Sequence, residues 1–329
     1  MFVDARNPHE SNEAKARPFV DIVFRLCFYP RHFPNPEFFP QVFVIGHASI
    51  MREFRMMGSH QAFAKFMDSV LEAKAALNLR HHQDAFFRGH SSNHYTLLPS
   101  LFRQPAPRGE NDFYWRLERR TFFEFRTLAR ELYSESRRDW DVLFHMQHHG
   151  VPTRLLDWTS VFGVALYFAV FDPHRTEESV PCIWLLSPYA LNYAVWNTHN
   201  LFNPTYLARD ERNSRSYDFG ELLLEAHREA KHMNWERLPW DKPLAIYDNQ
   251  RSDRMFAQSG WFTIHGTNLA PLEEIFPDTP TILNKVDIPI EAIPAAKEFL
   301  KLAGIGHRQI FPGLDGLAKS VNERFGIAR

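Results

Sequence analysis

The residue types best suited to chemistry gather in one short stretch, QHHGVPTRLLDWT, at positions 147–159. It contains His148 and His149, and His145 lies one helical turn before them. This spacing can present two imidazoles to one metal ion, as in paired-histidine zinc motifs. The glutamate base of those motifs is absent, and Asp157 lies beyond a Gly-Val-Pro break. We therefore predict no metal site in this stretch.

Other polar residues stand in apolar surroundings. Arg88 follows Ala-Phe-Phe, Arg154 and Asp157 flank a Leu-Leu pair, and Gln258 precedes Gly-Trp-Phe. A buried arginine needs a partner, and its planar fork suits a carboxylate or a diphosphate equally well. The simplest interpretation of Arg154 is an ion pair with Asp157 that locks a turn, and that of Thr159 is an N-cap of the next helix.

Covalent catalysis has little support. The only cysteines are Cys27 and Cys182, and we expect both to be reduced and buried. No Gly-x-Ser-x-Gly elbow occurs, and the glycine-rich segment GIGHRQIFPG lacks the Lys-Ser/Thr ending of a phosphate loop. The formal net charge of -1 provides no overall cationic field for nucleic acid or anionic membranes.

The elements that must position these residues predict an α+β fold. We expect strands in the segments AFFRG, CIWLLS, LAIYD, WFTIHG and ILNKVDI. After CIWLLS, Ser187 and Pro188 are predicted to be the cap and the first position of a short helix. Between the strands lies a helix over 110–133, whose buried stripe is predicted to include Leu128 and Leu132 and whose RLERR run is predicted to lie on a solvated face. A helix from Asp139 to a C-terminal Gly150 and a buried helix in SVFGVALYFAVF are also predicted. Two amphipathic helices, 291–302 and 314–325, close the chain. Since strands and helices do not alternate strictly, a mixed fold is favoured over a doubly wound sheet.

The predicted domain organisation is an arm followed by one main domain. Residues 1–58 are rich in proline and aromatic residues, which predicts an extended arm that packs on the domain or contacts a partner. Residues 59–329 form the main domain, in which helices surround a central, split sheet. Its first helix begins at an N-cap, Ser59, and a polar loop insertion covers about 197–219.

The chain start is polar and charged, and no uncharged apolar run approaches the roughly 20 residues of a membrane span. We therefore expect a cytoplasmic protein that has no contact with a membrane.

Four separated segments resemble the FRG domain, a bacterial and phage family named for its Phe/Tyr-Arg-Gly motif. They are FRG at 87–89, QHHGVPTRLLDWTSVFGVALYFA at 147–169, RMFAQSGWFTIHG at 254–266, and GIGHRQIFPGLDGLAKSV at 304–321. They occur in the family's order, and the resemblance covers roughly Ser59 to Phe325, without the proline-rich start. More distantly, their layout is similar to that of ADP-ribosyltransferases.

The second resemblance implies a site for NAD, which would be a substrate. Arg88 would be its first element, Tyr167 would stack on nicotinamide, and Gln258 would take the third place, where glutamine can orient a ligand but cannot act as a base. His148 or His149 would orient the ribose or serve as base. The implied catalytic residues are Arg88, Gln258 and His148, and the implied binding residues are Arg88, Gly89, His149, Thr153, Arg154, Asp157, Tyr167 and Gln258.

Three functions remain open at this point. The first is an ADP-ribosyltransferase-like toxin or anti-phage effector that modifies a nucleic acid, a nucleotide or a protein. The second is a non-catalytic module that binds a nucleotide or a partner, with the arm and the 197–219 loop as contact surfaces. The third is a nucleic-acid-acting enzyme such as a nuclease, for which the evidence is local: the segment RHHQDAFFRGH and the arginines between Arg209 and Arg215.

Overall fold

The structure of the protein is a computed structural model. It describes residues 40–108, 113–132, 139–172, 175–176, 178–202, 241–247, 260–325 and 327, with side chains from residue 56 onward except at 131, 315 and 323. The chain divides into two compact units, Met1–Arg55 and Met56–Arg329. The fold and the site described below belong to the second unit.

Among the described residues, six strands form the centre of this unit, and all of their pairings with one another are antiparallel. Their order across the sheet is β4-β5-β2-β1-β3-β6. The strands are β1 (Phe86–His90), β2 (Leu155–Thr159), β3 (Cys182–Leu186), β4 (Leu244–Ile246), β5 (Gly260–Ile264) and β6 (Leu283–Asp287). Together with the helices around them, they confirm the predicted α+β class.

The sheet is split between β1 and β2. These strands pair at one position only, Phe87 with Thr159, whereas β1 and β3 pair over the five residues from Phe86 to His90. The sheet therefore consists of two three-stranded halves, β4-β5-β2 and β1-β3-β6, which separate beyond that single pair. This confirms the split that the sequence suggested.

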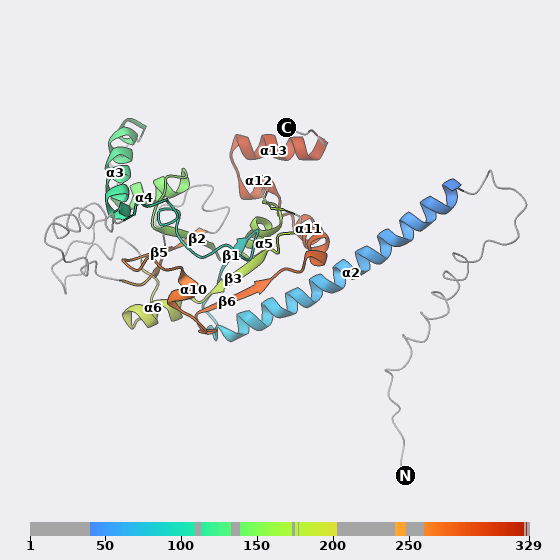
Figure 1. Ribbon diagram of the computed structural model, residues 1–329, viewed down its shortest axis with the longest axis horizontal. Helices are drawn as coiled ribbons and strands as arrows, with labels where there is room; N and C mark the ends of the chain where they lie inside the picture. Colours follow the sequence, from blue (N-terminus) through green and yellow to red (C-terminus); the bar gives the residue numbers. More distant parts are fainter. Residues whose placement is uncertain are drawn as a thin grey trace, which may run out of the picture. The chain divides into compact units, whose positions relative to one another are not determined.

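One face of the sheet is covered by two separate groups of helices (Figure 1). Helices α5 (Phe162–Val170) and α11 (Ile293–Leu302) pack on the β1-β3-β6 half, together with α2 (Pro40–Ala76), which contributes Phe66 and Val70. Helices α3 (Phe113–Leu128) and α4 (Asp139–His148) cover the other half through residues such as Phe122 and Phe144. The gap between the two groups lies over the split.

The opposite face carries a third hydrophobic core. Helices α6 (Pro188–Trp196) and α10 (Leu272–Ile275) pack there against aromatic residues of the strands, including Phe86, Trp158 and Trp184. Two short helical turns, η1 (Ala129–Leu132) and η3 (Ile290–Ala292), and the helices α12 (His307–Ile310) and α13 (Leu314–Phe325) complete the described elements.

Glycine is required where β1 meets α5. A Cβ atom on Gly89 would lie 1.9 Å from the carbonyl oxygen of Ala165. The absence of a side chain at Gly89 therefore lets the strand and the helix approach closely, which fixes one wall of the site described below.

Several local predictions are confirmed. The five predicted strands appear as β1, β3, β4, β5 and β6, and the closing helices appear as α11 and α13. Ser187 caps α6 by accepting a hydrogen bond from the backbone N–H of Ala190, and Gly150 follows α4 with a φ of 78°. Both capping residues behave as their types predict.

The prediction of a turn between Thr153 and Asp157 is wrong, because residues 155–159 form the central strand β2. Thr159 is also not the N-cap of α5. The N-cap is Val161, whose backbone N–H donates to the Thr159 hydroxyl over 3.1 Å. The local sequence did not indicate this strand, because the Leu-Leu pair is surrounded by glycine, proline and two charged residues. The strand forms through its hydrogen bonds with β5, which lies far along the chain.

The start of the first helix is also corrected. Helix α2 begins at Pro40, not at Ser59, and the Ser59 hydroxyl instead accepts a hydrogen bond from the backbone N–H of Ala295 over 3.0 Å. Proline is compatible with a first helical position, where its missing N–H has no intrahelical partner, and residues 41–58 contain no further proline. Residues 1–39 of the predicted arm and 203–219 of the predicted loop lie outside the described residues.

The buried face of helix α3 differs from the face that the sequence predicted to be buried. Leu128, and Leu132 in η1, are 69% and 85% exposed, whereas Glu118, which lies in the RLERR run, is fully buried beside Phe122. The expectation that this run is a solvated face is thus wrong, because Glu118 has a buried partner described below.

In the described part of the chain, no helix has both the length and the apolar character that crossing a membrane requires.

Candidate functional site

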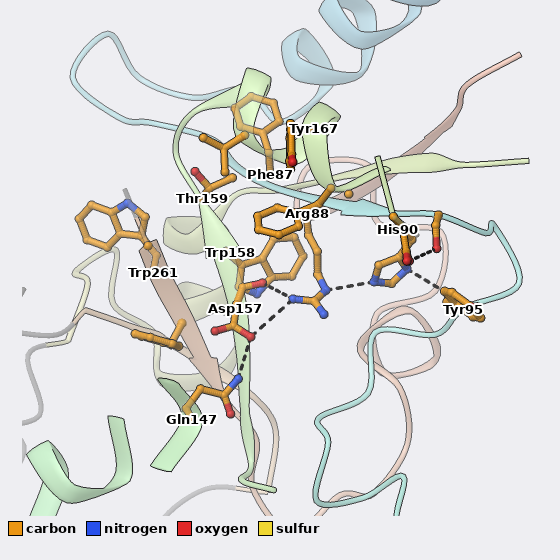
Figure 2. Close-up of a pocket in the computed structure, with 18 of the residues that line it drawn as sticks. Phe87, Arg88, His90, Tyr95, Gln147, Asp157, Trp158, Thr159, Tyr167 and Trp261 are labelled. Carbon is orange, nitrogen blue, oxygen red and sulfur yellow. Dashed lines mark hydrogen bonds and ion pairs between the residues drawn. The ribbon is translucent and has the colours of Figure 1, made fainter. Parts of the chain in front are cut away.

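A pocket of about 610 Å³ opens where the two halves of the sheet separate (Figure 2). Its floor consists of residues of β1, β2 and β5, and its walls come from α4 on one side and from α5 and α12 on the other. The loop after β1 and Lys319 of α13 also contribute to it. The split of the sheet therefore creates the pocket.

Arg88 bridges the two halves at the base of this pocket. Its Nη1 atom donates a hydrogen bond to the carbonyl oxygen of Asp157 over 2.6 Å, across the gap between β1 and β2. Its Nε atom donates to Nε2 of His90 over 3.0 Å. The Nη2 atom has no hydrogen-bond partner among the described residues. The guanidinium is thus held along one side, while its other N–H groups remain available to a ligand.

The hydrogen bond with Arg88 defines the tautomer of the His90 imidazole. Because Nε2 accepts from Arg88, the proton of a neutral imidazole must be on Nδ1, which lies 3.2 Å from the carbonyl oxygen of Tyr95. Burial, followed by the positive charge of Arg88, lowers the pKa of His90 to about 3. At neutral pH the imidazole is therefore uncharged and accepts the arginine N–H.

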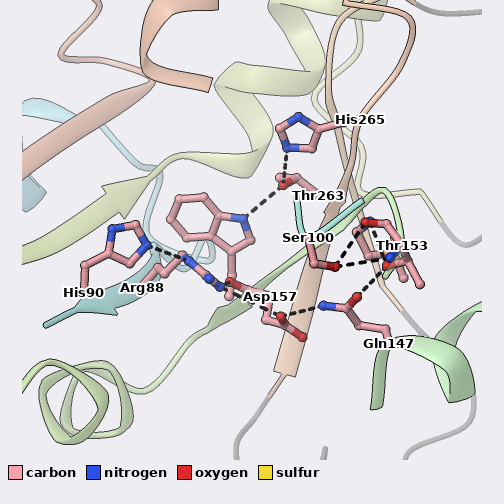
Figure 3. Close-up of polar contacts among 10 residues, drawn as sticks. Arg88, His90, Ser100, Gln147, Thr153, Asp157, Thr263 and His265 are labelled. Carbon is pink, nitrogen blue, oxygen red and sulfur yellow. Dashed lines mark hydrogen bonds and ion pairs between the residues drawn. The ribbon is translucent and has the colours of Figure 1, made fainter. Parts of the chain in front are cut away.

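A second group of hydrogen bonds fixes the Asp157 carboxylate (Figure 3). Gln147 donates from Nε2 to Asp157 Oδ2 over 2.7 Å, and its own Oε1 accepts from the Thr153 hydroxyl. Ser100 braces Thr153 through a hydrogen bond from the Thr153 backbone N–H to the serine Oγ, over 3.2 Å. Arg88 Nη1 lies 3.9 Å from Asp157 Oδ2. The pocket therefore contains a positioned carboxylate next to a positioned guanidinium.

Tyr167 and His307 form a pair on the opposite wall. The tyrosine hydroxyl lies 2.8 Å from His307 Nδ1, and the tyrosine ring stacks on Phe171 with centroids 4.9 Å apart. These contacts fix the ring of Tyr167, which is 7% exposed, at the border of the pocket.

The structure brings five of the proposed site residues together. Arg88, Gly89, His148, Asp157 and Tyr167 all line the pocket.

The other proposed residues lie elsewhere. Thr153 is fully buried behind Gln147, and His149 is exposed at the end of α4 and does not line the pocket. Gln258 lies outside the described residues, so its proposed role in the site stays a prediction.

Arg154 does not pair with Asp157, contrary to the simplest interpretation of the sequence. Its Nε atom donates to Glu118 Oε1 over 2.7 Å, its Nη2 contacts Glu118 Oε2, and its guanidinium lies 4.3 Å from the ring centroid of Trp115. In an extended segment, residues three positions apart point to opposite faces, which separates Arg154 from Asp157. The fork of Arg154 is engaged by Glu118, and Arg154 is not among the residues that line the pocket.

The residues at the site that were not selected from the sequence include His90, Gln147 and His307. The alternation of a strand could have indicated His90, because it lies two residues after Arg88 and therefore on the same face. No comparable local signal exists for the contacts of Gln147 with Asp157 or of His307 with Tyr167, since the latter two are 140 positions apart.

The pocket is both basic and aromatic. Besides the uncharged His90, its positive or protonatable side chains are Arg88, Arg103, His148, His307 and Lys319, and its aromatic side chains include Tyr95, Trp158, Tyr167, Phe168, Phe171, Trp261 and Phe311. Two carboxylates, Asp157 and Asp172, accompany them, and Asp172 accepts a hydrogen bond from Ser91 over 2.6 Å. This combination suits a ligand with both an anionic group and flat rings.

Two other kinds of chemistry have no support at the described residues. Cys182 is fully buried in β3, and burial raises the pKa of its thiol to about 12, which keeps it protonated at neutral pH. Nor do the described residues contain a group of three or more His, Cys, Asp or Glu side chains arranged to hold a metal ion.

Comparison with known proteins identifies part of this architecture. The FRG domain family matches residues 83–178, which is less than half of the chain. No curated protein and no solved structure matches the sequence. The matched segment contains β1, α3, α4, β2 and α5, and with them Arg88 and Asp157. Over residues 83–178, therefore, the chain is similar to the FRG domain family.

Proposed function

We propose that the pocket binds a nucleotide and that NAD is its substrate. The observation that carries this proposal is the guanidinium of Arg88, a residue that lines the pocket: His90 and the Asp157 carbonyl hold it, while its Nη2 group has no hydrogen-bond partner among the described residues. A positioned guanidinium of this kind is suited to a phosphate or diphosphate, because its N–H groups match two anionic oxygens.

The remaining lining residues support a nucleotide over a simple anion. A pocket of about 610 Å³ exceeds the needs of a free phosphate ion and lies in the range of small-molecule sites. Its aromatic side chains offer surfaces on which a base or a nicotinamide ring can stack. Arg103 and Lys319 add positive charge at separate positions, which suits a ligand with more than one anionic oxygen.

The activity that such binding would serve is ADP-ribose transfer to a nucleic acid, a nucleotide or a protein, as in a toxin or an anti-phage effector. In this proposal Arg88 binds the diphosphate, His148 acts on the ribose or the acceptor, and Gln258 orients the ligand. The bond between the ribose and nicotinamide breaks through a cationic state, which polar groups of fixed position can stabilise. A binding module without transfer remains the second candidate, since it needs the same pocket.

Calorimetric titration of the full chain with ADP-ribose and with NAD tests the binding. Arg88→Ala should raise the Kd for ADP-ribose by about 10- to 100-fold, because a charged hydrogen bond contributes about 1.5–3 kcal/mol. The matched control is Arg80→Ala, which removes an exposed arginine that does not line the pocket. An unchanged Kd in Arg88→Ala, or no binding of either ligand to the wild-type chain, would refute the proposal. An assay for the release of nicotinamide from NAD then decides whether the protein is an enzyme or a binding module.

A further inference from the structure

The Asp157 carboxylate is asymmetric in its contacts. Its Oδ2 atom accepts the hydrogen bond from Gln147 and faces Arg88 Nη1, whereas its Oδ1 atom has no hydrogen-bond or ion-pair partner in the described segments of the chain. The side chain is 58% exposed, although it belongs to a central strand. The site therefore presents one anionic oxygen whose position is fixed through the other.

The negative charge of this oxygen is unfavourable in a pocket that binds a purely anionic ligand. A carboxylate at the base of the pocket repels phosphate groups, and Arg88 neutralises it only partly from 3.9 Å. Repulsion becomes attraction if the ligand carries a positive charge as well as its phosphates. Arg88 and Asp157 would then contact the two oppositely charged parts of one molecule.

We propose that Asp157 is a specificity-determining residue that selects a nucleotide with a cationic ring, namely oxidised NAD over its reduced form. This inference rests on the proposed function. The two forms of NAD have the same diphosphate and nearly the same shape, but the nicotinamide ring of the oxidised form is a pyridinium cation and that of the reduced form is neutral. Oδ1 stabilises the pyridinium by charge, while the aromatic wall beside Tyr167 accommodates either ring.

The structural support for a positioned carboxylate extends beyond Asp157. Gln147 donates to Oδ2 and is itself held by Thr153, which Ser100 braces in turn. An asparagine at position 157 could still accept the Gln147 hydrogen bond through its amide oxygen, which makes Asp157→Asn a change of charge with little change of shape.

Titrations with oxidised NAD, reduced NAD and ADP-ribose, on wild-type and Asp157→Asn proteins, test the selection. The wild-type chain should bind the oxidised form about two- to fivefold more tightly than the reduced form, because an exposed ion pair contributes up to about 1 kcal/mol. In Asp157→Asn this ratio should fall to about one, while ADP-ribose, which lacks the ring, should bind at least as tightly as before. Asp278→Asn, at an exposed position outside the pocket, should keep the wild-type ratio.

The outcomes distinguish this inference from the function on which it rests. If ADP-ribose binds and the wild-type chain does not discriminate between the two forms of NAD, the role of Asp157 is refuted and the nucleotide site stands. A ratio that persists in Asp157→Asn also refutes it. If no nucleotide binds to the wild-type chain, both proposals fail together.

Discussion

Arg88 and His90 point to the same side of strand β1, and the Nε atom of Arg88 donates a hydrogen bond to Nε2 of His90 over 3.0 Å. His90 is 7% exposed and reaches the carbonyl oxygen of Tyr95 through its other ring nitrogen. The histidine thus ties the arginine to the loop after β1. Residues that act on a ligand through another side chain in this way need no contact with the ligand themselves.

The first prediction concerns this positioning role. His90→Ala should raise the Kd for ADP-ribose by about tenfold, because Arg88 loses one of its two anchors and a hydrogen bond of this kind contributes about 1–1.5 kcal/mol. His90→Gln should recover part of the affinity, since its carbonyl oxygen can again accept from Arg88 Nε. Calorimetric titration measures both variants.

His94→Ala is the matched control, because His94 is exposed and lies in the same loop without lining the pocket. It should bind ADP-ribose as the wild-type chain does. Equal affinities of His90→Ala and wild type would show that Arg88 does not depend on His90.

The second prediction concerns the buried ion pair of Arg154 and Glu118, whose side chains are 3% and 0% exposed. Glu118→Gln should lower the free energy of unfolding by about 3–5 kcal/mol, because it leaves the arginine charge buried without its counter-charge. Glu124→Gln is the control on the exposed side of the same helix, where a change within about 0.5 kcal/mol is expected. Urea denaturation measures both.

Replacing both partners distinguishes the contribution of the ion pair to stability from the cost of a buried charge without a partner. The double variant Glu118→Leu, Arg154→Met should be more stable than Glu118→Gln, since no uncompensated charge remains in the core. A double variant less stable than the single one would indicate that Arg154 holds His265 and Trp115 in place by contacts worth more than the ion pair.

The third prediction concerns the close approach of β1 and α5. Gly89→Ala should lower the free energy of unfolding by about 3 kcal/mol, because its Cβ atom would overlap the Ala165 carbonyl, a backbone atom that cannot rotate away. The control is Gly58→Ala in helix α2, where a Cβ atom meets nothing within 4 Å. The same change there should raise the stability by about 0.5–1 kcal/mol. Similar effects of the two substitutions would contradict the packing argument.

Local sequence signals account for most of the secondary structure. The run of apolar residues in CIWLLS, closed by Ser187 and Pro188, suffices to predict β3 and the start of α6. The apolar spacing of residues 314–325 likewise predicts the bounds of α13. In each of these cases the residues that decide the structure lie within the element or next to it.

The errors arise where the deciding partner is distant in sequence. Strand β2 exists because β5 pairs with all five of its residues, and β5 lies about a hundred positions later. Glu118 is buried because it meets Arg154, 36 positions away. The site shows the same limit: Arg88 and Asp157 could be selected as polar residues in apolar segments, but their contact across the split, 69 positions apart, could not be predicted.

The fourth prediction concerns the free energy of unfolding as a function of pH. In mild acid, two buried histidines should cause most of its change. Burial lowers the pKa of both His90 and His265 to about 3, whereas a histidine in the unfolded chain has a pKa of about 6.5. As the pH falls from about 6.5 towards 3, the unfolded chain therefore takes up a proton at each imidazole that the folded chain does not. Each histidine should then lower the free energy of unfolding by up to about 1.4 kcal/mol per pH unit.

Urea denaturation between about pH 6.5 and pH 4.5 tests this sign and its assignment. His90→Gln and His265→Gln should each show a shallower loss of stability than the wild-type chain, because each removes one proton that only the unfolded state binds. His94→Gln, at an exposed position, should keep the wild-type slope. Burial raises the pKa of Glu273, which works in the opposite direction at acid pH, so the comparison between variants decides the assignment and the absolute slope does not. If His90→Gln lost stability as steeply as the wild-type chain, the imidazole of His90 would have to be protonated in the folded state, and it could not accept the hydrogen bond from Arg88.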